Sequence, residues 1–113
     1  MIARTWRGWT SVASADAYEQ LLLGTVVPGI VARRIPGFIE IQVLRGAPSG
    51  DEVEFTTIMW FDSLAAVRQF AGDDHERAVV PPAARALLLR FDERSTHAEV
   101  LSSLHGTHEG DKP

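Results

Sequence analysis

The sequence predicts a small α+β domain in which helices cover one antiparallel sheet. Its 113 residues are the length of one domain, and 45% hydrophobic with 23% charged residues is typical of a folded protein. Segments with strand-like alternation are separated by segments with helix caps and helical spacing of apolar residues. A loop rich in Gly, Pro and Ser joins two alternating segments, as in a hairpin.

The first predicted element is a strand and the second is a helix. Apolar and polar residues alternate over residues 2–10, which is typical of a strand. Residues 11–14 then predict a turn. Asp16 and Glu19 stand three apart and form an acidic version of the capping box, which places the beginning of a helix there. We expect this helix to reach about Arg34.

Proline and glycine set the next boundaries. Pro28 has no N–H to donate to the carbonyl four residues earlier, so we expect a kink or break at residues 25–29. A Pro-Gly pair ends the helical segment. Clean alternation over residues 38–45 predicts the second strand, and the loop at residues 46–51 leads into a third strand antiparallel to it.

The second half of the sequence repeats the strand-helix pattern. Residues 52–61 predict the third strand, and Asp62 or Ser63 caps a helix that ends at Gly72. A proline pair is tolerated in the first turn of a helix, so a further short helix is expected over residues 83–90.

The last predicted elements are a fourth strand and a tail. Residues 95–101 predict the strand, and the domain then covers residues 1–101. Residues 102–113 are rich in Ser, Gly, His and charge, which predicts a flexible C-terminal tail. The order β-α-β-β-α-β is that of a ferredoxin-like fold, a four-stranded antiparallel sheet with both helices on one face.

Apolar residues on both faces of the strands predict a homodimer. Trp6 and Trp9 lie on opposite faces of the first strand, and Met59 lies opposite Ile58 and Trp60 on the third. A sheet with one face in water carries polar residues on that face. An apolar patch of that size is rare in a monomer, so we expect two sheets to pack face to face as a dimeric α/β barrel.

Composition excludes several classes of protein. A formal net charge of −4 argues against a nucleic-acid partner, since such binding depends on clustered Lys and Arg. The absence of Cys excludes disulfides, thiolate catalysis and sulfur-ligated metals, and four scattered His make a poor metal site. There is neither a signal sequence nor a run of about 18 apolar residues, so we expect a cytoplasmic protein with no membrane contact.

His97 and Arg4 are the candidate catalytic residues. The pKa of a histidine lies close to working pH, so His97 on the last strand would serve as a general base. The alternative is a half-buried histidine that forms a hydrogen bond across the sheet. Arg4 and Arg7 alternate faces, so at most one points into a pocket, where its planar fork would bind a carboxylate or enolate oxygen.

Five further residues are considered for substrate binding. Trp6, Trp60 and Phe70 would stack on a planar substrate, and their alternative role is core packing. His75 follows the second helix among acidic residues that would orient it, although loop histidines commonly lie in water. Tyr18 would donate to a substrate oxygen, but surface packing is the more common role.

With these elements in view, residues 1–101 resemble the antibiotic biosynthesis monooxygenase domain family of dimeric α/β barrels. The resemblance rests on the opening MIARTWRG, on WFDSLAAVRQFAG at residues 60–72 and on HAEV at residues 97–100. These motifs identify the fold group and do not identify a reaction.

The resemblance implies a pocket between the sheet and its helices, used in characterised members for oxygen-dependent chemistry on an aromatic or haem-like substrate. Some members have no cofactor and let the substrate activate dioxygen. Haem-degrading members carry an Asn on the first strand, a Trp in the second helix and a His further along. Thr5 or Trp6, Phe70, and Val79 or Val80 stand at those positions here.

The leading hypothesis is a cofactor-independent monooxygenase that acts on a small aromatic or polyketide-like substrate. His97 would accept the proton, an arginine or a Trp N–H would hold the oxyanion, and Trp60 with Phe70 would form walls. The alternative is a non-catalytic dimeric module that binds a small ligand or acts in a stress response. A haem-binding protein is a third reading.

Overall fold

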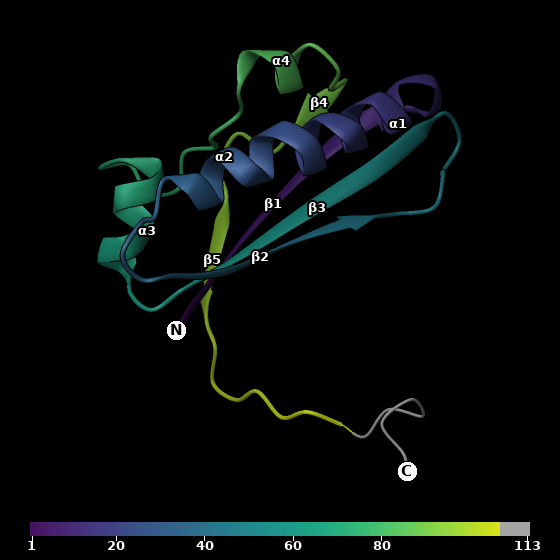
Figure 1. Ribbon diagram of the computed structural model, residues 1–113. Helices are drawn as coiled ribbons and strands as arrows, with labels where there is room; N and C mark the ends of the chain where they lie inside the picture. The colour runs from purple at the N-terminus through teal and green to yellow at the C-terminus, as the bar shows by residue number, and fades with distance from the viewer. Residues whose placement is uncertain (107–113) are drawn as a thin grey trace.

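The computed structural model describes residues 1–106 and shows an antiparallel sheet covered by helices on one face (Figure 1). The predicted α+β, ferredoxin-like fold is confirmed. The elements are β1 (Ile2–Ser11), α1 (Val12–Leu21), a π-helical segment (Leu22–Val26), α2 (Val27–Ala32), β2 (Phe38–Arg45), β3 (Glu52–Phe61), α3 (Leu64–Ala71), α4 (Pro82–Arg85), β4 (Arg90–Phe91) and β5 (Thr96–Glu99).

The central strand of the sheet is β1. It pairs with β3 over its whole length, and β2 pairs with the other side of β3. On its second side, β1 pairs with β5 at residues 2–5 and with β4 at Gly8 and Trp9. The described residues therefore form five strands, where the sequence predicted four. The additional strand, β4, has two residues and is defined by its pairing with β1.

Helix α1 begins earlier than the acidic residues predicted. Ser11 caps it, because the backbone N–H of Ser14 donates to Ser11 Oγ at 3.1 Å. The predicted turn at residues 11–14 is therefore the first helical turn. Asp16 and Glu19 lie within the helix and instead accept from the Arg45 guanidinium of β2, at 2.9 and 3.0 Å.

The predicted break near Pro28 is present as a π-helical turn. The segment Leu22–Val26 precedes α2, and the N–H of Val27 donates to the carbonyl of Leu22, five residues earlier. Proline removes one helical donor, and a widened turn is one way in which a helix absorbs such a defect. The irregular turn begins three residues before the predicted range of 25–29.

The last helix is shorter than predicted. Residues 83–90 were expected to be helical, but α4 ends at Arg85, and the chain then runs along β1. The N–H of Leu89 donates to the carbonyl of Trp9 at 2.8 Å. Residues 89 and 90, which the sequence assigned to the end of the helix, therefore pair with β1 instead.

The two faces of the sheet differ in what covers them. Arg4 pairs with Met59, so both point toward the helices, whereas Trp60 pairs with Ala3 and points away. We call the uncovered side the open face; it carries Trp9, Ile58, Trp60 and Leu44 together with polar residues of the same strands.

A bulge in β2 shifts its faces relative to the predicted alternation. The register changes between Phe38 and Glu40, so Phe38 joins Ile41 on the helix side. Strict alternation over residues 38–45 would place Ile39 on the same face as Ile41, but Ile39 is 54% exposed and lies outside the core.

The core consists of two clusters beneath the helices. One cluster centres on Tyr18, Phe55 and Leu22 under α1, and the other on Phe61, Met59 and Phe70 next to α3. Tyr18 packs edge-on against Phe55 at 4.8 Å between ring centroids, and is 1% exposed. The expected surface position of Tyr18 was therefore wrong.

The predicted tail, residues 102–113, follows β5 and is described only in its first part. Residues 102–106 carry no helix or strand, and the remaining residues of the tail, 107–113, lie outside the described part of the chain. The domain boundary after residue 101 and the flexibility of the tail stay predictions. Among residues 1–106, no helix has the length and hydrophobicity needed to cross a membrane.

Candidate functional site

A chamber of about 60 Å³ lies between the two core clusters, under the junction of the helices with the sheet. Its walls are almost entirely apolar. Its lining comes from every helix, from strands β1, β2 and β3, and from the chain on either side of α4: Arg4, Trp6, Tyr18, Leu22, Val26, Val27, Ile30, Ile41, Val43, Thr57, Met59, Phe70, Val79, Val80, Pro81, Ala84 and Ser95.

An outer hollow of about 310 Å³ adjoins the chamber between α2 and the segment before α4. Val26, Ile30, Phe70, Val79 and Pro81 line both spaces. The shared walls make the outer hollow the approach to the chamber. Sites for small ligands have volumes of about 300–1,000 Å³, so the two spaces together reach the lower end of that range.

Arg4 is a buried cation in the chamber wall. It is 3% exposed, and Nη2 donates to the carbonyl of Arg77 at 2.8 Å, while Nη1 donates to the carbonyl of His75 and contacts His97 Nε2 at 3.0 Å. Burial lowers the pKa of Arg4 to about 10, so the guanidinium keeps its charge at neutral pH. Among residues 1–106, no ion pair includes Arg4.

His97 meets Arg4 because their strands pair with each other. Arg4 and His97 are directly opposite in the β1–β5 ladder and share the helix side. Arginine has no acceptor, so His97 Nε2 must accept and the proton of the neutral ring lies on Nδ1. Burial, with the neighbouring charge of Arg4, lowers the pKa of His97. The alternative reading, a histidine with a hydrogen bond across the sheet, describes this contact.

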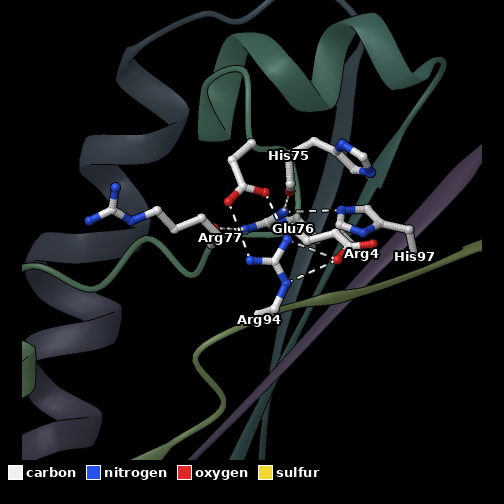
Figure 2. A network of polar contacts seen from close by, with 7 residues as sticks. Arg4, His75, Glu76, Arg77, Arg94 and His97 are labelled. Carbon is white, nitrogen blue, oxygen red and sulfur yellow. Dashed lines mark hydrogen bonds and ion pairs between the residues drawn. The ribbon is translucent and has the colours of Figure 1, made fainter.

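Arg4 also holds the loop after α3, because the carbonyls of His75 and Arg77 accept from its guanidinium (Figure 2). Arg94 adds ion pairs to Asp74 at 2.8 Å and to Glu76 at 3.0 Å. The N–H of Ser95 donates to the carbonyl of Glu76 at 2.6 Å. These contacts fix the loop whose continuation, through Val79 and Pro81, forms part of the chamber wall.

The structure brings some of the predicted site residues together and separates others. Arg4, Trp6 and Phe70 line the chamber, whereas His75, His97 and Trp60 do not. His75 and His97 lie next to each other, with ring centroids 5.2 Å apart, on the far side of Arg4. Trp60 lies on the open face, on the opposite side of the sheet from Arg4.

The two chamber aromatics are both fixed by neighbours. Trp6 Nε1 donates to the carbonyl of Asp92 at 2.8 Å, so its N–H is used within the protein. The Phe70 ring lies 5.4 Å from the guanidinium carbon of Arg4 and 5.2 Å from that of Arg33. Cations at such distances favour the ring face of an aromatic residue.

Three lining residues carry hydroxyl groups, Tyr18, Thr57 and Ser95, and sequence reasoning singled out only Tyr18. Ser95 is 4% exposed, and Tyr18 was expected at the surface. Burial raises the pKa of Tyr18 to about 12, so the phenol stays protonated. A single serine before a strand has no periodic signal; Tyr18 could have been found from its spacing of three and four residues from the apolar positions Ala15 and Leu22.

The described residues offer no suitable ligand set for a metal ion or for haem in the chamber. In the described part of the chain, no three His, Asp or Glu side chains are grouped so that they could hold a metal ion. Haem iron commonly takes a His axial ligand, but the histidines do not line the chamber, and its volume of about 60 Å³ is too small for the porphyrin. The chamber residues therefore do not fit haem.

The fold is that of the antibiotic biosynthesis monooxygenase structures, a class of ferredoxin-like α+β domains. A Streptomyces coelicolor monooxygenase from the gene ActVA-Orf6, in complex with nanaomycin D, matches with a TM-score of 0.65 and 18% identity, over 94% of this chain and 92% of the other. A Deinococcus radiodurans protein named for the antibiotic biosynthesis monooxygenases matches with a TM-score of 0.63 and 16% identity, over 96% and 100%.

A dimeric ferredoxin-like protein from an uncultured marine organism also shares the fold, with a TM-score of 0.59 and 12% identity over 93% of this chain and 98% of the other. No family model matches the sequence, and no curated protein is similar enough to count as a relative. These likenesses define the fold of the chain.

Proposed function

We propose that the protein is a cofactor-independent monooxygenase that binds a small aromatic or polyketide-like substrate in the chamber. One observation carries the proposal: Arg4 is a buried cation in the chamber wall, and none of the ion pairs among residues 1–106 includes it. A buried charge without a counterion favours an opposite charge nearby. The substrate that suits such a wall is one that becomes an anion.

The reaction uses this preference for an anion. A carbon acid next to an aromatic ring, such as an anthrone, loses a proton in the chamber, and the positive charge of Arg4 stabilises the anion. The anion gives electrons to dioxygen, a C–O bond forms, and loss of water from the resulting peroxide leaves a ketone. A CH₂ group and O₂ thus become C=O and H₂O, so the substrate supplies all the electrons.

In this proposal His97 positions Arg4. It does not line the chamber, and its Nε2 accepts from the guanidinium at 3.0 Å. A proton on Nε2 would remove that hydrogen bond and place two cations side by side, so we assign His97 an orienting role in place of proton transfer. The substrate proton then leaves to solvent through the outer hollow.

The open face supports the homodimer that the sequence predicted. Trp9, Ile58 and Trp60 lie there, and no helix of the described chain covers them. Large apolar side chains on an uncovered sheet favour a symmetric partner. A protein with this fold is described as dimeric, which adds support for two copies packed through this face.

Dioxygen uptake tests the proposed reaction. The protein is mixed with a panel of anthrones and hydroquinones, and consumption is measured with an oxygen electrode against two matched variants. Ile30→Trp fills the chamber, since Ile30 lines both spaces. Val31→Trp adds the same ring one residue later, at a side chain that is 52% exposed.

We expect uptake in the wild type and in Val31→Trp and loss of uptake in Ile30→Trp. Equal rates in all three proteins would show that the chamber does not carry the reaction. A second measurement addresses the anion directly: a nitrophenol bound to the protein should have a lower pKa than in water, because Arg4 favours the phenolate.

A non-catalytic binding module is the second candidate, and a specific observation favours it. Arg4 and His97 form their hydrogen bonds with protein groups, and neither is placed to take a proton from a ligand in the chamber. This candidate predicts that the nitrophenol binds with a lowered pKa while no substrate of the panel consumes dioxygen.

A further inference from the structure

The chamber contains a buried hydroxyl that has no partner in the protein. Ser95 is 4% exposed, it lines the chamber, and no hydrogen-bond partner of its Oγ lies among the described residues. Ser95 comes two residues before His97, so the pleat places both side chains on the helix side of the sheet, where Arg4 also lies.

An unpartnered buried hydroxyl destabilises a folded protein, and the structure contains a second example for comparison. Thr10 on β1 is fully buried, and its Oγ1 also lacks a partner among residues 1–106. Thr10 does not line the chamber. Both residues therefore have a buried hydroxyl without a partner, but only the hydroxyl of Ser95 belongs to a residue that lines the chamber.

The rest of the lining explains why a ligand oxygen would come to Ser95. The indole N–H of Trp6 is used by Asp92, and the guanidinium of Arg4 is used by backbone carbonyls and His97. Tyr18 adds a hydroxyl to the lining, and its pKa near 12 keeps it a donor. Hydroxyl donors in a chamber whose wall also contains a buried positive charge suit an oxygen that carries negative charge.

We propose that Ser95, with Tyr18 as second donor, forms the subsite that binds the phenolic or carbonyl oxygen of the ligand. This inference rests on the proposed function and narrows its substrate class. The ligand is a flat apolar ring system with an oxygen at the Arg4 end, and its apolar body extends past Ile30 and Phe70 toward the outer hollow.

Two ligands that differ by one oxygen test the subsite. Naphthol and naphthalene share a ring system, and each is titrated by calorimetry into the wild type, Ser95→Ala and Thr10→Val. We expect Ser95→Ala to bind naphthol about tenfold more weakly, as for the loss of one hydrogen bond in a dry site, and naphthalene unchanged. Thr10→Val should bind both ligands like the wild type.

Stability provides a control for folding. Both substitutions remove an unpartnered buried hydroxyl, so both free proteins should melt at the wild-type temperature or above it. A stable Ser95→Ala protein with weaker naphthol binding then separates a ligand role from a structural one.

The possible results distinguish this inference from the proposed function. Equal naphthol affinity in the wild type and Ser95→Ala overturns the subsite, as does the absence of naphthol binding to the wild type, whatever the oxygen electrode shows. Ser95-dependent binding of naphthol without dioxygen uptake by any substrate supports the subsite and removes the monooxygenase.

Discussion

Arg4 and His97 lie 93 residues apart in the chain and meet at 3.0 Å between Nη1 and Nε2, across the β1–β5 ladder. The guanidinium can only donate, so the contact requires a neutral histidine with its proton on Nδ1. It also fixes the direction of the arginine, whose other donors hold the carbonyls of His75 and Arg77. A protonated His97 would oppose this arrangement, which gives the first prediction.

Stability should fall as pH decreases below the ordinary histidine pKa of 6.5, because the pKa of His97 is lowered in the folded state. Below 6.5 the unfolded chain binds a proton that folded His97 resists, so the stabilisation is complete above 6.5 and is lost as pH falls toward the folded value. Urea unfolding midpoints measured between neutral and acid pH should show this slope.

The control is His97→Gln, which keeps an acceptor for Arg4 and does not titrate. Its unfolding midpoint should depend less on pH than that of the wild type. His105→Gln, at an exposed position after β5, should keep the wild-type slope. Identical slopes in wild type and His97→Gln would contradict the lowered pKa of His97 in the folded state.

Arg4→Lys should destabilise the protein by about 3 kcal/mol, because the three acceptors lie around two separate guanidinium nitrogens and the single nitrogen of an ammonium cannot reach all of them. The loop around His75 should then exchange its amide hydrogens faster, as mass spectrometry would detect. Arg7→Lys is the matched control on the same strand; its side chain is exposed, and a change within about 0.5 kcal/mol is expected. Equal losses in both variants would argue against the buried role of Arg4.

Gly8→Ala should cost about 1–3 kcal/mol, since a Cβ there would lie 2.7 Å from a ring atom of Trp6 and 2.9 Å from Leu88 Cδ2. Gly24→Ala should instead stabilise the protein by about 0.5–1 kcal/mol, because Gly24 is helical and a Cβ meets nothing within 4 Å. Thermal unfolding of both variants checks the pair. A Gly8→Ala protein as stable as the wild type would mean that the Trp6 ring does not lie over Gly8.

Trp60→Glu should shift the protein from dimer to monomer, because it places a charge on the apolar part of the open face. Sedimentation over a range of concentrations measures the shift. Val31→Glu introduces the same charge at an exposed apolar residue of α2 and should leave the association unchanged. A wild type that sediments as a monomer throughout would contradict the proposed dimer.

The sequence predicted the middle of the fold well. The bounds of β2 and β3 agree with residues 38–45 and 52–61, because alternation is clear there and turn residues stand at both ends. Helix α3 begins after Ser63, whose Oγ accepts from the N–H of Ala66 at 3.2 Å, and it ends at Gly72. Caps and stops of this kind are local signals that a single sequence contains.

Other parts of the fold depend on contacts that sequence patterns do not carry. Strand β4 has two residues and exists through pairing with Gly8 and Trp9. The start of α1 was misplaced because Asp16 and Glu19 imitate a cap but bind Arg45. Such choices are made by tertiary pairing, which overrides local preference.

The candidate site shows the same division. Alternation predicted that Arg4 and Arg7 point to opposite faces, but only the register of β1 with β3 shows that Arg4 faces the helices. The same register places Trp60 on the open face, although its residue type had suggested a substrate wall. Ser95 stood outside every motif, and its burial beside the chamber became visible only in three dimensions.

The central place of β1 has a consequence for how the chain reaches its native state. Every residue that pairs with β1 comes at least forty residues after its partner in the chain. Strand β5, which contains the partner of Arg4, is the last to be made. Pairings between distant segments are slow to form, because the intervening chain must first be brought together. During synthesis the Arg4 guanidinium therefore cannot bind His97 until nearly the whole domain has left the ribosome.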